Sequence, residues 1–234
     1  MATFVLVHGA WYGGWCYAPV ARSLRAAGHE VFTPTLTGLG ERSHLAGIKI
    51  DLSLHIRDLL NVLEYEDLQD VILCGHSYGG MVVTGAAARA AERIRGLVYI
   101  DAFLPRDGQA LWDIVDEPSR AMYIDNQRDS AGLMAPPFAP PSPCPPDGPP
   151  VPRKPSRHPL LTVTEPVRLT GAETRIRNRT YIYADKVTPT LFTQFYDALR
   201  DHPAWKVRSI RTGHSVMTED PEGLTALLLE EVDR

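Results

Sequence analysis

The hydrophobic and polar positions along the chain form two alternating kinds of segment. Short, largely apolar runs predict strands over residues 4–7, 30–33, 71–74, 94–100, 179–184 and 205–210. The segments between these strands predict helices over residues 17–27, 53–66, 81–91, 189–200 and 221–232. Strands and helices that alternate in this rhythm predict an α/β fold with a mostly parallel, doubly wound sheet.

Residues at three of the predicted helix ends have the chemistry that helix ends need. Gly28 follows the first helix and is expected to stop it, because glycine tolerates the left-handed conformation common there. Ser53 is the predicted N-cap of the second helix, since its hydroxyl can accept a bond from a free backbone N–H. Pro189 is expected to begin the fourth helix, where a missing N–H costs nothing.

The alternating rhythm breaks between residues 105 and 167, where no strand is evident. Twelve of the chain's 20 prolines lie within residues 136–159, and proline neither pairs in a sheet nor continues a helix. We expect short helices at residues 111–115 and 119–123, and an extended or mobile strap over residues 135–159. A disordered linker is the alternative, but too few residues follow for a second domain. We therefore expect a lid over residues 105–167 inserted in a core formed by residues 1–104 and 168–234.

The third predicted strand runs directly into the pattern G-x-S-x-G, with Ser77 between Gly75 and Gly79. A glycine on each side removes the side chains that would collide in a sharp strand-to-helix turn. This arrangement is typical of a nucleophile elbow, which exposes a serine hydroxyl above the carboxyl edge of the sheet. The pattern alone occurs by chance, but its position between a strand and a helix favours Ser77 as a nucleophile.

A serine nucleophile needs a neutral imidazole to accept its proton and a carboxylate to orient that imidazole. His214 follows Thr212-Gly213 directly after the last predicted strand, and it is the candidate base. The other seven histidines are expected to be structural or exposed, with His55 and His158 showing no partner pattern. Asp101 and Asp185 each follow a predicted strand and are the two candidate acids.

Developing negative charge on a substrate oxygen needs backbone donors held in place. The candidates are the N–H groups of Tyr78, next to the serine, and Ala10, in the glycine-rich loop after the first strand. That loop lacks the lysine of a phosphate-binding loop and the third glycine of a dinucleotide fingerprint. Apolar and aromatic side chains on these strand-end loops predict an apolar pocket, with packing of the lid as the alternative role of Trp15 and Trp112. The side chains are those of Trp11, Tyr12, Trp15, Tyr78, Phe103, Trp112 and Met217.

Composition narrows the functional class. The net charge of −4 gives no broad electrostatic case for nucleic acid, and no apolar run is long enough to cross a membrane. The three cysteines show neither metal-ligand spacing nor a disulfide framework, so no metal is expected and a reducing compartment fits. A strand close behind Met1 leaves no room for a signal peptide. We expect a cytoplasmic protein, a monomer or homodimer, that binds a small-molecule ester.

Four segments together resemble the hydroxynitrile lyase and methyl esterase group of plant α/β-hydrolases and its bacterial esterase relatives. The segments are V-H-G-A-W-Y-G-G-W at 7–15, T-G-L-G-E-R-S-H-L at 37–45, G-H-S-Y-G-G-M-V at 75–82 and T-G-H-S-V-M at 212–217. The resemblance covers nearly the whole chain except the proline-rich segment. It implies hydrolysis of small aromatic or aliphatic carboxylic esters, or of a lactone, through an acyl-enzyme and without a cofactor.

The resemblance also bears on the acid. Asp185 occupies the usual position of the group, in a D-x-x-x-P pattern, but the loop before it is about two residues short. Asp101, in Y-I-D-A-F-L-P, resembles the relocated acid of some haloalkane dehalogenases and zearalenone lactonases. A carboxylate buried there would be costly unless it met an imidazole N–H. We favour Asp101, with Asp185 as the alternative and a lid-turn cap as the other role for Asp101.

Two further functions are compatible with this family resemblance. A lyase on the same fold is one, although the lyases of the group carry a lysine where this chain has Ser215. A small-molecule receptor is the other, and an intact serine–histidine pair does not exclude it. A haloalkane dehalogenase would need an aspartate in place of Ser77, so that chemistry is excluded.

Overall fold

Six parallel strands form the central sheet of the computed structural model, which describes residues 1–46, 49–128, 130–137 and 155–233. The strand order is β2-β1-β3-β4-β7-β8. In chain order the strands are β1 (Thr3–Val7), β2 (Glu30–Phe32), β3 (Val71–His76), β4 (Ile94–Ile100), β7 (Asn178–Ala184) and β8 (Lys206–Ile210). Every neighbouring pair is parallel, so the expected parallel sheet of an α/β fold is confirmed.

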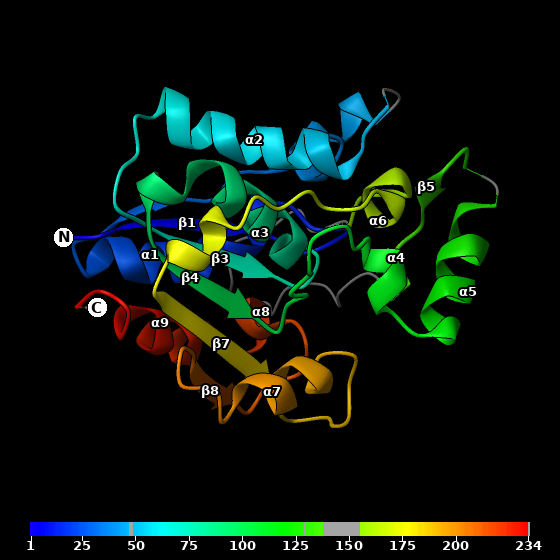
Figure 1. Cartoon of the computed structure of the whole chain (residues 1–234). Coiled ribbons are helices and arrows are strands. Elements are labelled where there is room, and N and C mark those ends of the chain that lie inside the picture. The colour runs from blue at the N-terminus through cyan, green and yellow to red at the C-terminus, as the bar shows by residue number, and fades with distance from the viewer. Residues whose placement is uncertain (47–48, 129, 138–154, 234) are drawn as a thin grey trace, which may run out of the picture.

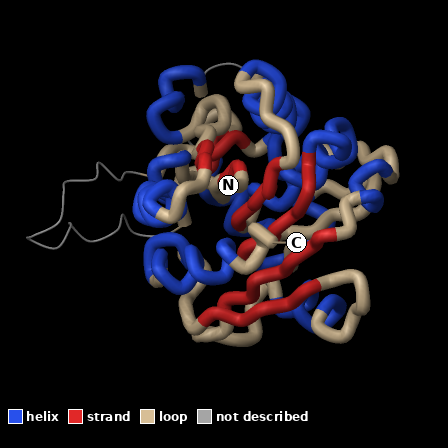
Figure 2. The backbone as a smooth tube through the Cα atoms, turned by 90° about the vertical axis from the view of Figure 1, so that its left-hand side faces the viewer, coloured by secondary structure: helices blue, strands red, loops and turns tan. Residues whose placement is uncertain are grey.

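Helices cover both faces of this sheet (Figures 1 and 2). One face carries α1 (Ala18–Ala26) and α9 (Pro221–Leu229), and the other carries α2 (Leu52–Tyr65) and α3 (Gly79–Ala90). Because strand side chains alternate between faces, β3 gives Leu73 to the α2/α3 core and Cys74 to the α1/α9 core. The shorter helical segments are η1 (Gly14–Tyr17), η2 (Gly40–Leu45), η3 (Ala91–Arg93), η4 (Ala172–Arg175), α7 (Thr193–Leu199) and α8 (Val216–Glu219).

Two of the predicted helix ends are wrong and one is confirmed. Asp51 caps α2 by accepting a bond from Leu54 N–H, so Ser53 lies within the helix. The helix α7 begins at Thr193 and not at Pro189, because residues 191–192 form a turn directly before it. Gly28 follows α1 with φ of 86°, the left-handed conformation expected of it.

The segment between residues 105 and 167 forms small elements beyond the carboxyl ends of the strands (Figure 1). They are α4 (Leu111–Ile114), α5 (Glu117–Gln127), β5 (Leu133–Met134), β6 (His158–Pro159) and α6 (Leu161–Thr164). The antiparallel pairing of β5 with β6 corrects the expectation that this segment holds no strand. We call the described part of this segment the insert. Most of the predicted proline strap, residues 138–154, lies outside the described residues.

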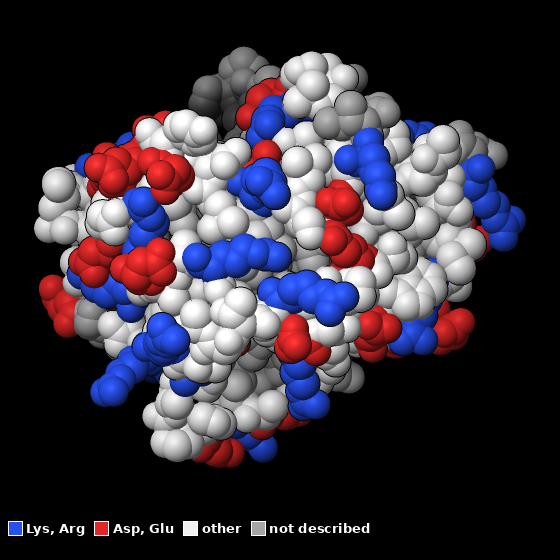
Figure 3. All heavy atoms as spheres, turned by 45° about the horizontal axis from the view of Figure 1, so that its top comes forward, with Lys and Arg blue, Asp and Glu red and all other residues white. Residues whose placement is uncertain are grey.

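Charged side chains of both signs are interspersed over the face that Figure 3 presents, with no field of one sign. This mixture agrees with the small net charge of −4. Among the described residues, no helix combines the length and apolarity that a membrane span requires.

Candidate active site

Ser77 occupies the sharp turn between β3 and α3 with φ of 52°, a conformation that non-glycine residues rarely adopt. A Cβ on Gly75 would lie 2.7 Å from the Gly79 carbonyl oxygen, and one on Gly79 would lie 2.7 Å from the Val7 carbonyl oxygen. Both glycines are therefore needed for the close approach of three backbone segments. The Ser77 carbonyl accepts a bond from Phe103 N–H at 3.1 Å, which fixes the turn against the loop after β4.

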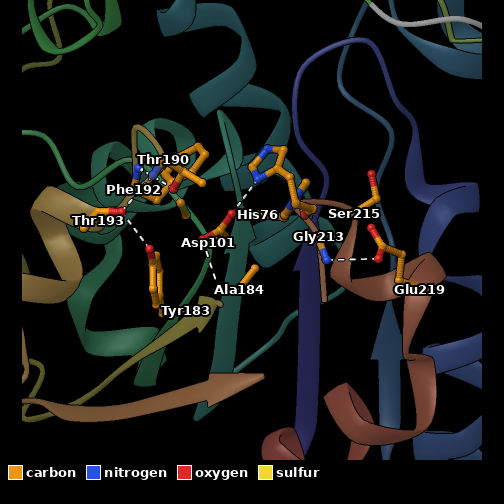
Figure 4. A network of polar contacts seen from close by, with 12 residues as sticks. His76, Asp101, Tyr183, Ala184, Thr190, Phe192, Thr193, Gly213, Ser215 and Glu219 are labelled. Atoms are coloured by element: carbon orange, nitrogen blue, oxygen red, sulfur yellow. Dashed lines mark hydrogen bonds and ion pairs between the residues drawn. The ribbon is translucent and has the colours of Figure 1, made fainter. Parts of the chain in front are cut away.

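Asp101 lies directly after β4, the neighbouring strand, and its side chain is 1% exposed. Its Oδ2 accepts a hydrogen bond from His214 Nδ1 at 2.6 Å, and its Oδ1 accepts one from Ala184 N–H at 3.2 Å. Figure 4 shows Asp101 with a dashed line toward Ala184. Because an ionised carboxylate only accepts, Nδ1 of His214 carries the proton and Nε2 is left as an acceptor.

The imidazole of His214 packs against two other rings. Phe192 stacks on it with ring centroids 4.7 Å apart and an interplanar angle of 10°, and His76 lies 4.6 Å away at 37°. His76 Nε2–H donates to the His214 carbonyl oxygen at 2.8 Å. Burial and the nearby His214 lower the pKa of His76 well below its usual value, so the His76 ring is neutral.

The two candidate oxyanion donors belong to backbone segments next to Ser77. Tyr78 follows it in sequence and precedes α3, so its N–H belongs to a helix N-terminus, where the macrodipole favours negative charge. Ala10 follows Gly9, which is so close to the serine that an added Cβ would lie 2.9 Å from Ser77 Cβ. The structure thus brings together the four residues Ser77, Tyr78, His76 and Gly9 at the ends of β1 and β3.

Asp185, the other candidate acid, is not brought to His214. Its N–H donates to the Ile210 carbonyl oxygen, and its Oδ1 is buried without a hydrogen-bond partner among the described residues. It lines a separate hollow of about 280 Å³ with Tyr183 and Asp197, among others. The structure therefore separates the two candidates: Asp101 meets the histidine and Asp185 does not.

The predicted pocket residues divide between the two hydrophobic cores. Trp11, Phe103 and Trp112 belong to the core that contains the insert. Met217 belongs to the α1/α9 core instead and is 1% exposed, and Tyr12 and Trp15 pack against that core too. The aromatic residues that can line one pocket beneath the insert are therefore fewer than the sequence predicted.

Three fully buried histidines form a polar cluster that sequence analysis missed. His55 Nε2–H donates to the Thr37 carbonyl oxygen at 2.9 Å, and its Nδ1 accepts from the Tyr78 hydroxyl at 2.8 Å. His158, from the insert, lies 6.1 Å from the His55 ring and 4.8 Å from the Tyr78 ring. His8 donates to the Gly9 carbonyl oxygen at 2.8 Å and accepts from Leu36 N–H. No local spacing marks these residues, because most of their partners, such as Leu36 for His8 and Tyr78 for His55, are distant in sequence.

The buried cluster is uncharged near neutral pH. Burial lowers the pKa of His8 and of His55 to about 4, and it lowers that of His158 well below the usual value. Burial also raises the pKa of the Tyr78 hydroxyl, which therefore stays protonated and donates to His55. Among the described residues, no cluster of His, Cys, Asp or Glu could hold a metal ion.

Comparison with known proteins places these observations in a family context. Residues 4–227 match the model of the Alpha/beta hydrolase family. The carbendazim hydrolyzing esterase of Nocardioides sp. (strain SG-4G) is 43% identical over 238 residues, covering 97% of this chain and 98% of that protein. The putative chloroplastic methylesterase 14 of Arabidopsis thaliana is 34% identical over 115 residues, 49% of this chain and 33% of that protein.

Among solved structures, a pyrethroid hydrolase from Sphingobium faniae JZ-2 superposes with a TM-score of 0.74 at 24% identity. The match covers 99% of this chain and 97% of that one. At this level of identity the likeness shows a shared fold.

Proposed function

Because the chain belongs to the alpha/beta hydrolase family and is an ester hydrolase, we propose that it cleaves carboxylic esters by the chemistry of Ser77, His214 and Asp101. The observation that supports this most strongly is the 2.6 Å hydrogen bond from His214 Nδ1 to Asp101 Oδ2. It fixes the tautomer in which Nε2 of His214 can accept a proton from the serine hydroxyl.

In the proposed reaction, Ser77 Oγ attacks the ester carbonyl carbon while His214 Nε2 takes the hydroxyl proton. Asp101 stabilises the imidazolium that forms. The carbonyl oxygen becomes an oxyanion, for which the Ala10 and Tyr78 N–H groups are the proposed donors. When the carbon–oxygen bond to the alcohol breaks, His214 returns the proton to the alcohol and an acyl-serine remains. Water then attacks with His214 as base, which releases the acid and restores Ser77.

Aromatic residues near the proposed site support a substrate class. Trp11, Phe103 and Trp112 pack in the core that contains the insert, and aromatic walls favour aromatic or extended acyl groups. The 43% identical relative is named as a carbendazim hydrolyzing esterase. We propose small aryl esters as substrates, with carbendazim as a second compound to assay.

A lyase and a small-molecule receptor are the alternatives, and a simple assay separates them from a hydrolase. Purified protein should release p-nitrophenol from p-nitrophenyl acetate and from a p-nitrophenyl ester of an aromatic acid, with the aromatic ester preferred. A fluorophosphonate probe should label wild-type protein but not Ser77→Ala. The Ser77→Ala variant should lose at least about 10³-fold in kcat, because the three groups act as a unit. Near-normal hydrolysis by that variant would refute the proposal.

A further inference from the structure

Trp11 lies next to the proposed oxyanion donor Ala10 and has φ of 66°. A bulky residue with a positive φ is strained and keeps that conformation only when its surroundings hold it. The direction of the Ala10 N–H depends on the backbone conformation at Gly9, Ala10 and Trp11. Whatever holds Trp11 therefore also affects where the Ala10 N–H points.

The insert makes three hydrogen bonds to Trp11, one to each of its polar groups. Trp11 N–H donates to His158 Nδ1 at 3.4 Å, and the Trp11 carbonyl accepts from Ser156 N–H at 2.9 Å. The indole Nε1–H donates to the Met134 carbonyl oxygen at 3.2 Å. The partners stand on or next to the paired strands β5 and β6. Residues on or near this short strand pair thus bind both peptide groups that flank the strained Trp11, and its indole ring.

His158 is itself held firmly and reaches the second proposed donor. Since Nδ1 of His158 accepts from Trp11, the proton of the neutral ring is on Nε2. Nε2–H donates to Thr162 Oγ1 at 2.7 Å, and the Thr162 hydroxyl in turn donates to the Pro159 carbonyl oxygen. The His158 ring is fully buried and lies edge-on against the Tyr78 ring, with centroids 4.8 Å apart. One insert residue therefore contacts the neighbour of Ala10 and the side chain of Tyr78.

We propose that His158 is a positioning residue, which aligns the Ala10 and Tyr78 N–H groups for the oxyanion by holding Trp11 and packing against Tyr78. The proposal rests on the function proposed above. It gives the insert a role in the chemical step, beyond covering the substrate. A neutral ring is needed at this position, because protonated Nδ1 could not accept the Trp11 N–H.

Two substitutions of His158 separate its hydrogen bonds. The Asn side-chain oxygen in His158→Asn stands near the place of Nδ1 and can still accept from Trp11, whereas the longer Gln in His158→Gln reaches toward Thr162. Both lose the ring packing on Tyr78. We expect His158→Gln to lower kcat for a p-nitrophenyl ester by about 10-fold or more with KM within about 2-fold, a partial loss of oxyanion stabilisation. His158→Asn should keep kcat at least about 3-fold above His158→Gln. Equal values for the two variants, or a change in KM alone, would overturn the proposal.

A tetrahedral inhibitor supplies the readout that a purely structural role would not change. Phenylboronic acid forms an anionic adduct with an active serine, so its inhibition constant should weaken in His158→Gln in parallel with kcat. An inhibition constant unchanged from wild type would contradict the role. His29→Gln is the matched control, because His29 Nδ1 also accepts a backbone N–H, from Ala2 at 3.2 Å, but far from the site.

If His158→Gln fails to fold, Ser156→Pro tests whether the insert positions Trp11 through a second contact, the one to the Trp11 carbonyl. It removes the N–H that binds the Trp11 carbonyl, whereas Ser156→Ala removes only the hydroxyl that accepts from Gly40 N–H. The proline variant should lose kcat and the alanine variant should not, and equal kcat values would overturn the proposal. Ser77→Ala is measured alongside. If it is active, the proposed function fails, and if it is inactive while the His158 and Ser156 variants match wild type, only the positioning role fails.

Discussion

Three residues around the site, Trp11, Ser77 and Asp101, have positive φ values of 66°, 52° and 41°. Each follows the carboxyl end of a strand, where the chain turns sharply away from the sheet. Such conformations cost on the order of 1–3 kcal/mol each and persist only where surrounding contacts hold them. The insert holds Trp11, and the close backbone approach at the flanking glycines holds Ser77. Asp101 is held by the hydrogen bond from its N–H to the Ile182 carbonyl at 2.7 Å.

Gly79 is expected to tolerate no side chain. A Cβ there would lie 2.7 Å from the Val7 carbonyl oxygen and 2.8 Å from that of His8, both of them backbone atoms that cannot move freely. Gly79→Ala should lower the free energy of unfolding by about 2 kcal/mol, a typical cost of overpacking. Gly96→Ala, whose added Cβ meets its nearest atoms at 3.6 Å, is the control and should lose less than about 1 kcal/mol. Denaturant unfolding measures both, and similar losses would contradict the steric argument.

Phe192 is expected to assist catalysis by keeping the His214 ring in place. An aromatic stack contributes about 0.5–1.5 kcal/mol, so Phe192→Leu should lower kcat by roughly 3- to 10-fold. Phe195→Leu is the matched control, because the Phe195 ring contacts Phe103 and Tyr181 instead of stacking on His214. Steady-state kinetics on one p-nitrophenyl ester compare the two variants. An unchanged kcat in Phe192→Leu would show that the stack is without consequence.

At the scale of elements, three buried histidines lie where β1, α2 and β6 come together. His8 follows β1, His55 lies on α2, and His158 lies on β6. None of the three is exposed to solvent. The junction between the sheet, the helical layer and the insert is thus polar and hydrogen-bonded, and it depends on these imidazoles being neutral.

This junction predicts how stability depends on pH. The folded pKa values of His8 and His55 are lowered to about 4, so below the usual value near 6.5 the unfolded chain binds protons that the folded chain does not. The contribution of these two neutral histidines to the free energy of unfolding is fully present above about pH 6.5. It is lost as the pH falls toward 4, on the order of 3 kcal/mol for each histidine over the full range.

Denaturant unfolding at pH 7, 6 and 5 tests this dependence. The free energy of unfolding should fall over this range in wild type, and the fall should be smaller in His55→Gln, which has no titrating group at that position. Since both proteins carry the same carboxylates, the difference in slope belongs to the histidine. Parallel slopes would contradict the assignment of His55 as a buried neutral imidazole.

The whole molecule shows which parts of its structure local sequence can predict. The central strands β1 and β3 were evident because their apolar residues are contiguous. Ser77 was evident because a glycine two residues before it and another two residues after it mark the turn. The choice between two candidate acids remained open because Asp101 and Asp185 both follow strands of one sheet. Their separation needed the path of the loops after β4 and β8, which determines where the His214 ring points.

Other features could not be predicted because they depend on contacts between distant segments. His158 meets Trp11 147 residues away in sequence, across an insert whose composition suggests no fold. Met217 points to the opposite core because the short helix α8, which has no periodic pattern of its own, turns it there. The antiparallel pairing of β5 with β6 involves two residues on each side, too few to leave a pattern.

The central claim is that Asp101, and not Asp185, orients the catalytic histidine, and paired substitutions test it most directly. Asp101→Asn keeps the shape but presents the wrong group to His214 Nδ1, so kcat on a p-nitrophenyl ester should fall on the order of 10³- to 10⁴-fold. Asp185→Asn, the matched change at the other strand end, should stay within about 3-fold of wild type, because Asp185 has no contact with His214 among its hydrogen bonds. Circular dichroism confirms that both variants are folded. A crippled Asp185→Asn beside a nearly normal Asp101→Asn would contradict the account.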